Sequence, residues 1–264
     1  MYEVGLLDGK RALVCGSSQG IGRACAMELA RLGSAVTVVA RDESALRKVV
    51  AELTGIGGRD HRSIAADFAD PPALQAKVAA HLKEVGAISI LVNNTGGPPH
   101  GALTEAKPEQ FLQAISNHIV CNQLLVQTLL PAMLSGGYGR IINIISTSVV
   151  APVKGLGVSN TTRGAVANWG RTLAGELAPF GITVNNILPG YTATARLQSL
   201  FAAKAEKAGT SAKEIERQTI ELIPMGRLAG PEEIAAVVGF LASPGASYLT
   251  GVNLPVDGGR TAVQ

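Results

Sequence analysis

The run Cys15-Gly16-Ser17-Ser18-Gln19-Gly20-Ile21-Gly22 is the part of the sequence best suited to bind a ligand through its backbone. An apolar segment, 11–15, precedes it, and a helix-forming segment, 21–32, follows it. Glycines between a strand and a helix let the backbone approach a bound group, and the first helical turn offers free N–H groups. This context favours a pyrophosphate-binding loop over a simple tight turn. The predicted contacts are Gly16, Ser18, Gln19, Gly20, Ile21 and Gly22.

Arg41 follows the second apolar segment, 35–40, which ends in Ala40. In dinucleotide-binding folds an acid near this position accepts hydrogen bonds from a free ribose 2′-hydroxyl. Ala40 offers no acceptor, whereas Arg41 offers a charge-assisted partner for a 2′-phosphate. The sequence therefore predicts NADP rather than NAD. The alternative is that Arg41 only forms a surface ion pair with Asp42.

The elements that must position these residues alternate between short apolar runs and longer segments of helical period. Near-continuous apolar runs are typical of strands buried on both faces of a parallel sheet. The predicted strands are 11–15, 35–40, 88–92, 140–145 and 182–188. The predicted helices are 21–32, 43–54, 72–85, 108–134, 163–178 and 231–241. This alternation predicts an α/β, doubly wound Rossmann fold with a mainly parallel sheet flanked by helices.

The length and composition agree with one globular domain over residues 1–264. The chain is 47% hydrophobic and 16% charged with 31 Gly and 13 Pro, which excludes a coiled coil, a disordered tail and a collagen-like rod. The net charge of +3 comes from scattered basic residues, so we expect no nucleic-acid partner. One segment, 192–222, breaks the alternation and is expected to be either a solvated helix pair or a lid over a substrate.

The cysteines and the N-terminal residues indicate a cytoplasmic protein. Cys15, Cys25 and Cys121 are odd in number and lack the spacing of a disulfide framework or a metal site, so we expect no bound metal. The sequence begins without a signal-peptide pattern, and no run was expected to reach the length of a membrane span.

Several motifs in consistent order resemble the short-chain dehydrogenase/reductase family, in particular its 3-oxoacyl-carrier-protein reductases, along nearly the whole chain. The glycine run is similar to TGxxxGIG, with Cys15 in place of Thr. The stretch Asn93-Asn94-Thr95-Gly96 is similar to NNAG, with Thr95 in place of Ala. Further cofactor contacts implied by the resemblance are Asp67 and Phe68 at the adenine, Asn93, Thr95 and Gly96 after the fourth strand, Arg163 at the ribose, and Pro189, Gly190 and Thr194 beside the nicotinamide.

The resemblance also implies a catalytic set that this chain only partly retains. Family members transfer a hydride between a nicotinamide cofactor and a carbonyl or alcohol, using Ser, Tyr, Lys and Asn. Ser146 matches the family serine, but the tyrosine position holds Ser159 and the lysine position holds Arg163. The asparagine position, counted back from Gly139, holds His118.

These replacements change the available acids. A phenol has a reference pKa of about 10 that a nearby cation can lower, whereas the Ser159 hydroxyl is a far weaker acid and shorter by a ring. Arg163 keeps a positive charge but is not equivalent to Lys. His118 is either a replacement proton donor or a hydrogen-bonded core histidine. Tyr191 has suitable chemistry, but it comes from a different wall of the pocket, which favours a packing role.

Two functions remain open from the sequence. The first is an NADP(H)-linked oxidoreductase acting on a small-molecule carbonyl or alcohol through a degenerate catalytic site. The second is a catalytically inactive, oligomeric Rossmann-fold binding protein with weak or no nucleotide binding. A serine hydrolase built on Ser146 and His118 lacks a nucleophile elbow and an orienting acid. The segment 231–241, with Ile234, Val237, Val238 and Leu241 at helical spacing, and the tail 251–259 predict a homodimer or homotetramer.

Overall fold

The sheet at the centre of the molecule places the glycine-rich loop at the carboxyl end of an inner strand, the third from one edge. In the computed structural model, which describes residues 5–263, seven strands form one sheet in the order β3-β2-β1-β4-β5-β6-β7. Every neighbouring pair is parallel. The strands are β1 (Arg11–Cys15), β2 (Ala35–Ala40), β3 (Arg62–Ala65), β4 (Ile90–Asn93), β5 (Gly139–Ile144), β6 (Ile182–Pro189) and β7 (Asn253–Val256). The predicted doubly wound α/β fold is confirmed.

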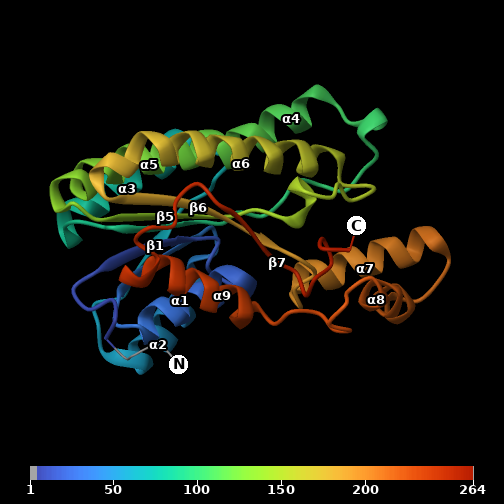
Figure 1. Cartoon of the computed structure of the whole chain (residues 1–264), viewed down its shortest axis with the longest axis horizontal. Coiled ribbons are helices and arrows are strands. Elements are labelled where there is room, and N and C mark those ends of the chain that lie inside the picture. The colour runs from blue at the N-terminus through green and yellow to red at the C-terminus, as the bar shows by residue number, and fades with distance from the viewer. Residues whose placement is uncertain (1–4, 264) are drawn as a thin grey trace.

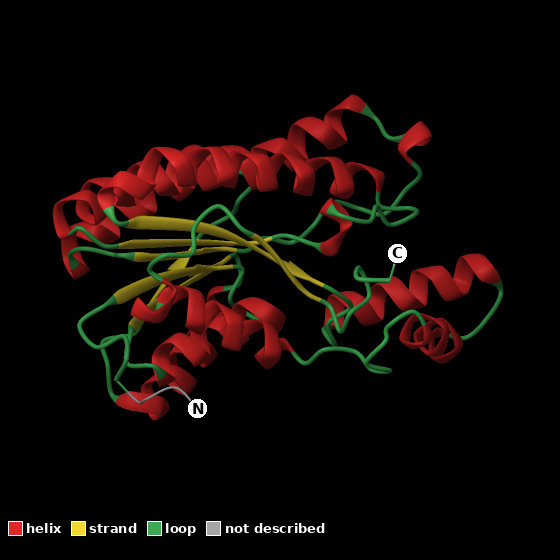
Figure 2. Ribbon diagram, viewed as in Figure 1, coloured by secondary structure: helices red, strands yellow, loops and turns green. Residues whose placement is uncertain are grey.

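Helices cover both faces of this sheet (Figures 1 and 2). One face carries α3, α5 and α6, with α4 continuing the line of α5, and the other carries α1, α2 and α9. Helices α7 and α8 lie beyond the end of the sheet, next to the C-terminal residues. The α-helices are α1 (Gly20–Arg31), α2 (Glu43–Gly57), α3 (Pro71–Val85), α4 (Pro108–Ile115), α5 (Cys121–Gly136), α6 (Gly157–Leu177), α7 (Ala195–Ala208), α8 (Ala212–Glu221) and α9 (Pro231–Ala242).

The apolar core forms two layers because successive strand residues point to opposite faces of the sheet. In β1, Val14 belongs to the layer beneath α1 and α9, whereas Leu13 belongs to the layer beneath α3 and α5. Both side chains are fully buried. This burial on both faces explains why the central strands are near-continuous apolar runs.

A row of asparagines crosses four adjacent strands at the same register. Asn93 Nδ2 donates to Asn143 Oδ1 at 2.9 Å, Asn143 Nδ2 donates to Asn186 Oδ1 at 2.8 Å, and Asn186 Nδ2 donates to Asn253 Oδ1 at 2.8 Å. The strand pairing aligns the same residues side by side. We call these four residues the asparagine ladder.

Several boundaries differ from those predicted. Strands β3 and β7 were not among the predicted strands because both are short and lie at the sheet edges, and β7 contains Asn253 and Pro255. Helix α6 begins at Gly157 rather than at residue 163, which puts Ser159 on the helix. The predicted helix 108–134 is interrupted by a π-helical turn, Ser116–Val120.

The predicted oligomer helix α9 is largely an internal element. Ile234, Val238 and Leu241 are fully buried within the molecule, in the layer that α9 shares with α1. Internal packing therefore accounts for the apolar spacing that had indicated a subunit contact. The oligomeric state itself stays a prediction.

One stretch of the described residues, Pro108–Gly136, is long and apolar enough by length and composition to cross a membrane. This corrects the expectation that no such segment exists. One face of the stretch packs into the core, where Leu125, Leu129 and Met133 are fully buried against the sheet. The same composition is typical of a core helix in an α/β fold, and we interpret it in that way.

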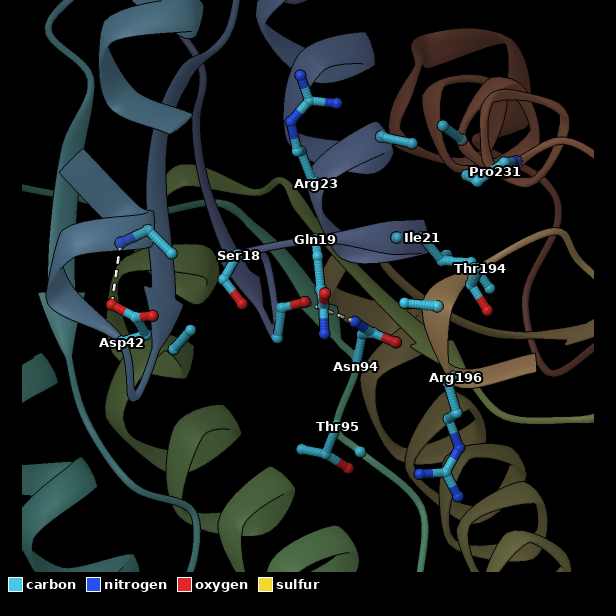
Figure 3. A pocket seen from close by; sticks show the side chains of 18 of the residues that line it. Ser18, Gln19, Ile21, Arg23, Asp42, Asn94, Thr95, Thr194, Arg196 and Pro231 are labelled. Carbon is cyan, nitrogen blue, oxygen red and sulfur yellow. Dashed lines mark hydrogen bonds between the residues drawn. The ribbon is translucent and has the colours of Figure 1, made fainter. Parts of the chain in front are cut away.

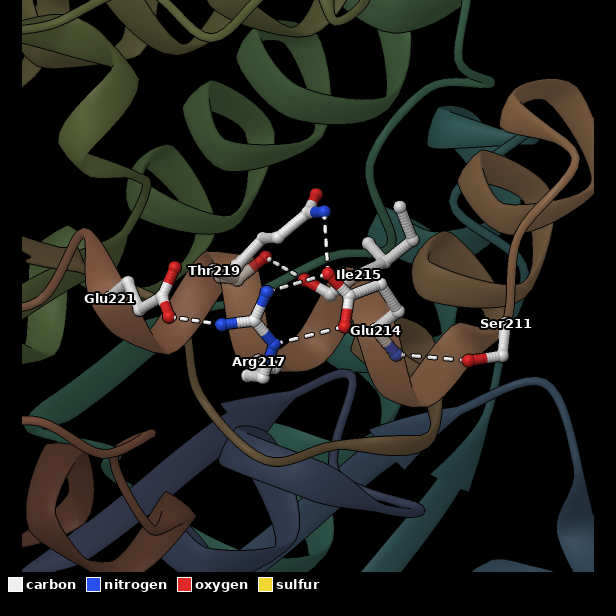
Figure 4. A network of polar contacts seen from close by, with 7 residues as sticks. Ser211, Glu214, Ile215, Arg217, Thr219 and Glu221 are labelled. Carbon is white, nitrogen blue, oxygen red and sulfur yellow. Dashed lines mark hydrogen bonds and ion pairs between the residues drawn. The ribbon is translucent and has the colours of Figure 1, made fainter.

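The segment 192–222 forms two helices joined by a short turn. Thr194 caps α7 by accepting from the Leu197 backbone N–H at 3.3 Å, and Ser211 caps α8 by accepting from the Glu214 N–H at 3.1 Å. On α8, Arg217 pairs with Glu214 at 2.7 Å and also with Glu221 (Figure 4). Whether the segment acts as a lid stays a prediction.

Candidate nucleotide and active site

A cavity of about 1270 Å³ opens where β1, β2, β3 and β4 reach their carboxyl ends. Figure 3 shows side chains from the glycine-rich loop, from the residues after β4 and from the segment at Thr194 facing the same space. The cavity brings together most of the predicted cofactor residues. Those lining it are Gly16, Ser18, Gln19, Gly20, Ile21, Arg41, Asp67, Phe68, Thr95, Gly96 and Thr194.

The glycine-rich loop is held in a conformation that suits glycine. Gly16 and Gly20 have φ angles of 59° and 55°, in the left-handed region. A Cβ on Gly22 would lie 2.2 Å from the Gly16 carbonyl oxygen, so the helix could not start so close to the loop with a larger residue. Asn94 Nδ2 donates to the carbonyl oxygens of Cys15 and Gly16, both at 3.2 Å. Asn94 thus fixes the loop, and its place in the Asn-Asn-Thr-Gly motif was the signal for it.

Arg41 lines the cavity and is exposed. Its neighbour Asp42 caps α2, because its carboxylate accepts from the Ala45 backbone N–H at 3.0 Å (Figure 3). Within residues 5–263 no ion pair joins Arg41 to Asp42. The alternative of a local surface pair is therefore not what this structure contains, and Arg41 is available to an anion in the cavity.

Five predicted cofactor residues lie outside the cavity wall. Gly22 lies beneath the loop, Asn93 belongs to the asparagine ladder, and Pro189 ends β6. Gly190 lies against the backbone of Asp257, where a Cβ would come within 2.7 Å of Asp257 Cα. The fifth, Arg163, lies in an adjoining narrow void. Direct contact of these five with a cofactor stays a prediction.

His118 lies in that narrow void, on the π-helical turn, with only 2% of its surface exposed. Its Nδ1 is 2.5 Å from Thr95 Oγ1. Burial, reinforced by the positive charges of Arg163 and Arg196, lowers the pKa of His118 to about 2. The imidazole is therefore neutral near pH 7. Of the two roles left open for it, the structure favours the hydrogen-bonded core histidine over the charged proton donor.

Arg163 crosses the void and connects two strand ends. Its Nη1 donates to the Ile144 carbonyl at 3.0 Å and its Nη2 donates to the Thr95 carbonyl at 3.3 Å. Burial and the nearby charge of Arg196 lower its pKa to about 10, so the guanidinium stays positive at neutral pH. Its hydrogen-bond partners in the described residues are neutral oxygens.

The two serines of the predicted catalytic set are partly buried and lie on different elements. Ser146 follows β5 and its Oγ accepts from the Ser148 backbone N–H at 3.1 Å. Ser159 lies in the first turns of α6, four residues before Arg163. In the described part of the chain no hydrogen bond joins either serine to His118, so a hydrolytic Ser–His pair is not assembled.

Two arginines near the site were missed by sequence reasoning. Arg196 lines the cavity, and its Nη2 donates to the Pro98 carbonyl at 3.2 Å. Arg260 is buried and its Cζ lies 5.2 Å from the centroid of the Tyr191 ring. The only signal was that each follows a recognised motif, Thr194 in one case and Asp257-Gly258-Gly259 in the other. Tyr191 thus packs against a cation, in keeping with the packing role expected for it.

Comparisons with known proteins agree with this geometry. The family model described as "Enoyl-(Acyl carrier protein) reductase" matches residues 16–261. The chain is 38% identical over 260 residues to the short-chain reductase protein NovJ of Streptomyces niveus, covering 98% of this chain and 96% of that protein. It is 34% identical over 255 residues to the 3-oxoacyl-[acyl-carrier-protein] reductase FabG of Pseudomonas aeruginosa, covering 96% and 98% of the two chains.

A solved structure is similar over the same length. The L-sorbose reductase of Gluconobacter frateurii, complexed with NADPH and L-sorbose, superposes with a TM-score of 0.91 at 31% identity, over 97% of each chain. The fold, the glycine-rich loop at the cavity and these matches lead to one conclusion: the chain belongs to the short-chain dehydrogenase/reductase family, whose members are NAD(P)-dependent oxidoreductases of carbonyl and alcohol groups.

Proposed function

We propose that this protein is an NADP(H)-linked oxidoreductase that acts on a small-molecule carbonyl or alcohol through an altered catalytic site. The observation that carries the proposal is Arg41, which lines the cavity while its acidic neighbour Asp42 is committed to the cap of α2. A guanidinium at this position pairs with a 2′-phosphate, and Ala40 offers nothing to a free 2′-hydroxyl. The sorbose reductase of similar fold was solved with NADPH, which supports the same preference.

The residues present fit a dinucleotide. The left-handed backbone at Gly16 and Gly20 and the close approach of Gly22 leave the N-terminal turn of α1 open toward the cavity, where a pyrophosphate would accept from backbone N–H groups. Asp67 and Phe68 would hold the adenine end, and Thr95, Gly96 and Thr194 the nicotinamide end. The bound cofactor would supply or accept the hydride.

The chain's own residues can stabilise negative charge more readily than they can donate a proton. The Ser146 hydroxyl and the positive charge of Arg163 lie at the ends of β4 and β5. His118 is neutral, and Ser159 brings no phenol to its position. Loss of a positioned general acid typically costs about 10²–10⁴ in rate, so we expect slow turnover of simple ketones.

Titration of the purified protein with NADPH and with NADH, followed by nicotinamide fluorescence, tests the proposal. We expect NADPH to bind more tightly, and Arg41→Asp to reverse the order. Arg47→Asp is the matched control, since Arg47 is on α2, exposed and, among residues 5–263, paired only with Glu43. Equal affinity of the parent for both nucleotides would refute the assignment.

The second candidate, a family member that binds nucleotide or another ligand without catalysis, is favoured by one observation: neither Ser159 nor His118 offers a usable acid near pH 7. The two candidates differ in a single measurement. Tight NADPH binding together with no oxidation of NADPH across a panel of ketones would favour the second.

A further inference from the structure

Three arginines lie near the carboxyl ends of β4, β5 and β6, and a lysine on α7 is within electrostatic reach of one of them. Two of them meet beside Gly97. A Cβ placed on Gly97 would lie 2.7 Å from Arg196 Nη2 and 3.6 Å from Arg163 Nη2, so both guanidinium groups approach the same point. Arg163 comes from α6 and Arg196 from α7, which face each other across the loop that follows β4.

The other two cations come from the C-terminal tail and from α7. Arg260 is 6% exposed, and its Nη1 lies 3.4 Å from Oγ1 of Thr147, the residue after Ser146. Its guanidinium also covers the ring of Tyr191, which follows β6, and its buried Nε has no hydrogen-bond partner in the described part of the chain. Arg260 therefore lies between the ends of β5 and β6. Lys204 is partly buried on α7, and burial together with the positive charge of Arg260 lowers the pKa of Lys204.

No acid in residues 5–263 forms an ion pair with any of these four side chains. Arg163 and Arg196 donate only to the carbonyl oxygens of Ile144, Thr95 and Pro98. By contrast, Arg217 is paired with Glu214 and Glu221 on the surface of α8 (Figure 4). Cations that are buried or crowded without a counter-charge are unfavourable, and an incoming anion removes that cost.

Asp257 is an acid near Arg260: burial raises its pKa, but hydrogen bonds from Thr261 and Gly259 and the charge of Arg260 lower it, so that the pKa lies below the usual value. Its carboxylate is already occupied. Oδ1 accepts from the Gly259 N–H at 3.0 Å, and Oδ2 accepts from the Thr261 N–H at 2.8 Å and from the Thr261 hydroxyl at 2.7 Å. It holds the turn that carries Arg260 and does not form a salt bridge with it.

The nucleotide accounts for part of this positive charge but not for all of it. Arg196 lines the nucleotide cavity, and Arg163 lies in the void next to it. Lys204 and Arg260 line neither space. Arg260 lies on the side where Tyr191 and Thr147 follow the strand ends, which is where a substrate oxygen would meet Ser146, and its charge reaches Lys204.

We propose that the substrate carries a small anionic group, a carboxylate or a phosphate, that binds to Arg260 and Lys204 with Arg163 and Arg196 on its nucleotide side. The planar fork of an arginine matches either group in a bidentate manner. This inference rests on the proposed function, because it names the substrate class of the same site. The anion also orients the substrate, since its charge fixes one end of the molecule in the pocket.

Calorimetric titration with matched acids and esters tests the proposal. The probes are acetoacetate and 3-oxooctanoate, each with its methyl ester, and inorganic phosphate, added to the protein with and without saturating NADPH. We expect each acid to bind about tenfold or more tightly than its ester, as a charge-assisted contact provides. Strong binding of phosphate with weak binding of both acids would identify the phosphate as the group recognised.

Variants of the proposed anion-binding residues test whether the acids bind at this site. Arg260→Gln and Lys204→Gln should each weaken acid binding by about fivefold or more and leave the esters unchanged. Lys207→Gln is the matched control, because Lys207 lies three residues further on the same helix and is exposed. Thermal unfolding of each variant shows whether it is folded. Unchanged acid binding in both folded variants would overturn the proposal.

The remaining outcomes separate this inference from the proposed function. If neither the acids nor phosphate bind, or if acid and ester bind equally, the anion proposal is wrong whatever NADPH does. If the acids compete with NADPH, the cations serve the nucleotide phosphates, and the proposal is again wrong while the NADP assignment stands. If the acids bind and NADPH does not, the proposed function fails and the anion site stands.

Discussion

His118 illustrates how burial removes a titratable group from its usual chemistry. Its pKa is about 2 in the folded protein, against 6.5 for an ordinary histidine. Above pH 6.5 the ring is mostly neutral in both the folded and the unfolded states. Ionisation of His118 therefore adds little pH dependence to the free energy of unfolding there. Below pH 6.5 the unfolded state binds a proton that the folded state cannot, and stability must fall.

We therefore expect His118→Gln to make stability less sensitive to acid. Between pH 6.5 and 5.5 the parent should lose about 1 kcal/mol more unfolding free energy than the variant, because the folded-state pKa lies far below this window. Urea unfolding at pH 7.5, 6.5 and 5.5 measures the difference. His61 and His81, whose pKa values are also lowered by burial, are present in both proteins and cancel. Parallel curves for parent and variant would contradict the assignment.

The altered pair on α6 predicts a gain of activity. Ser159 and Arg163 are four residues apart on one helix, the spacing of side chains on one face. Ser159→Tyr combined with Arg163→Lys should raise NADPH-dependent reduction of an activated ketone by about 10²-fold, the contribution of a general acid. Each single change should do much less, since the lysine acts by lowering the pKa of the tyrosine. A double variant no faster than the parent, with NADPH binding intact, would count against this interpretation.

The residues whose role depends on the local backbone, such as Gly16 and Gly20, could be predicted from the sequence, whereas Asn94 was part of a recognised motif but its hydrogen bonds to the loop were not predicted. The sequence did not reveal Arg196 or Arg260. Their relevance depends on side chains from α7 and from the C-terminal tail converging near Gly97 and Tyr191, and no spacing along the chain encodes that convergence.

At the scale of single elements, the asparagine ladder ties β4, β5, β6 and β7 together through side chains as well as through the backbone. Asn143 lies in its middle, fully buried, and both accepts and donates within it. Asn143→Leu should leave Asn93 and Asn186 each with an unpaired buried group, at a cost of about 2–5 kcal/mol in unfolding free energy. Denaturant unfolding measures this cost.

The end of the ladder supplies the comparison for that experiment. Asn253 is only partly buried on the edge strand β7, and it accepts one ladder bond, from Asn186. Asn253→Ala should cost about 1 kcal/mol, since water can replace the lost partner. Equal losses at the middle and at the end would show that the ladder does not act through buried pairing.

The sequence predicted the strands that are buried along nearly their whole length and missed those that are exposed or partly exposed at most positions. The fully buried β5 and β6 were recognised from their apolar runs. β3 and β7 are exposed in part, short and interrupted by polar residues or proline, so their sequences carry no strand period. The start of α6 at Gly157 has no capping side chain, so the sequence there carries no signal for a helix start.

At the scale of the whole molecule, several large apolar side chains remain exposed along the helices from α4 to α5. Leu112, Val120 and Leu134 are 69%, 40% and 40% exposed. We expect a second copy of the chain to cover these side chains, giving a homodimer or homotetramer. Light scattering at micromolar concentration should show a mass above 27.1 kDa, and Leu112→Glu should lower it. A monomeric parent would refute this prediction.

The π-helical turn at Ser116–Val120 has a consequence for how this helix tolerates change. Such a turn holds one residue more than an α-helical turn. The side chains of α4 and α5 on either side of it therefore do not follow one continuous helical repeat. Removing one residue from it would restore a continuous α-helix but rotate α4 against α5 by about 100°. The rotation would move the ring of His118 away from Thr95. It would also change the direction in which the Leu112 side chain on α4 points. The direction in which both residues point is thus set by one surplus residue.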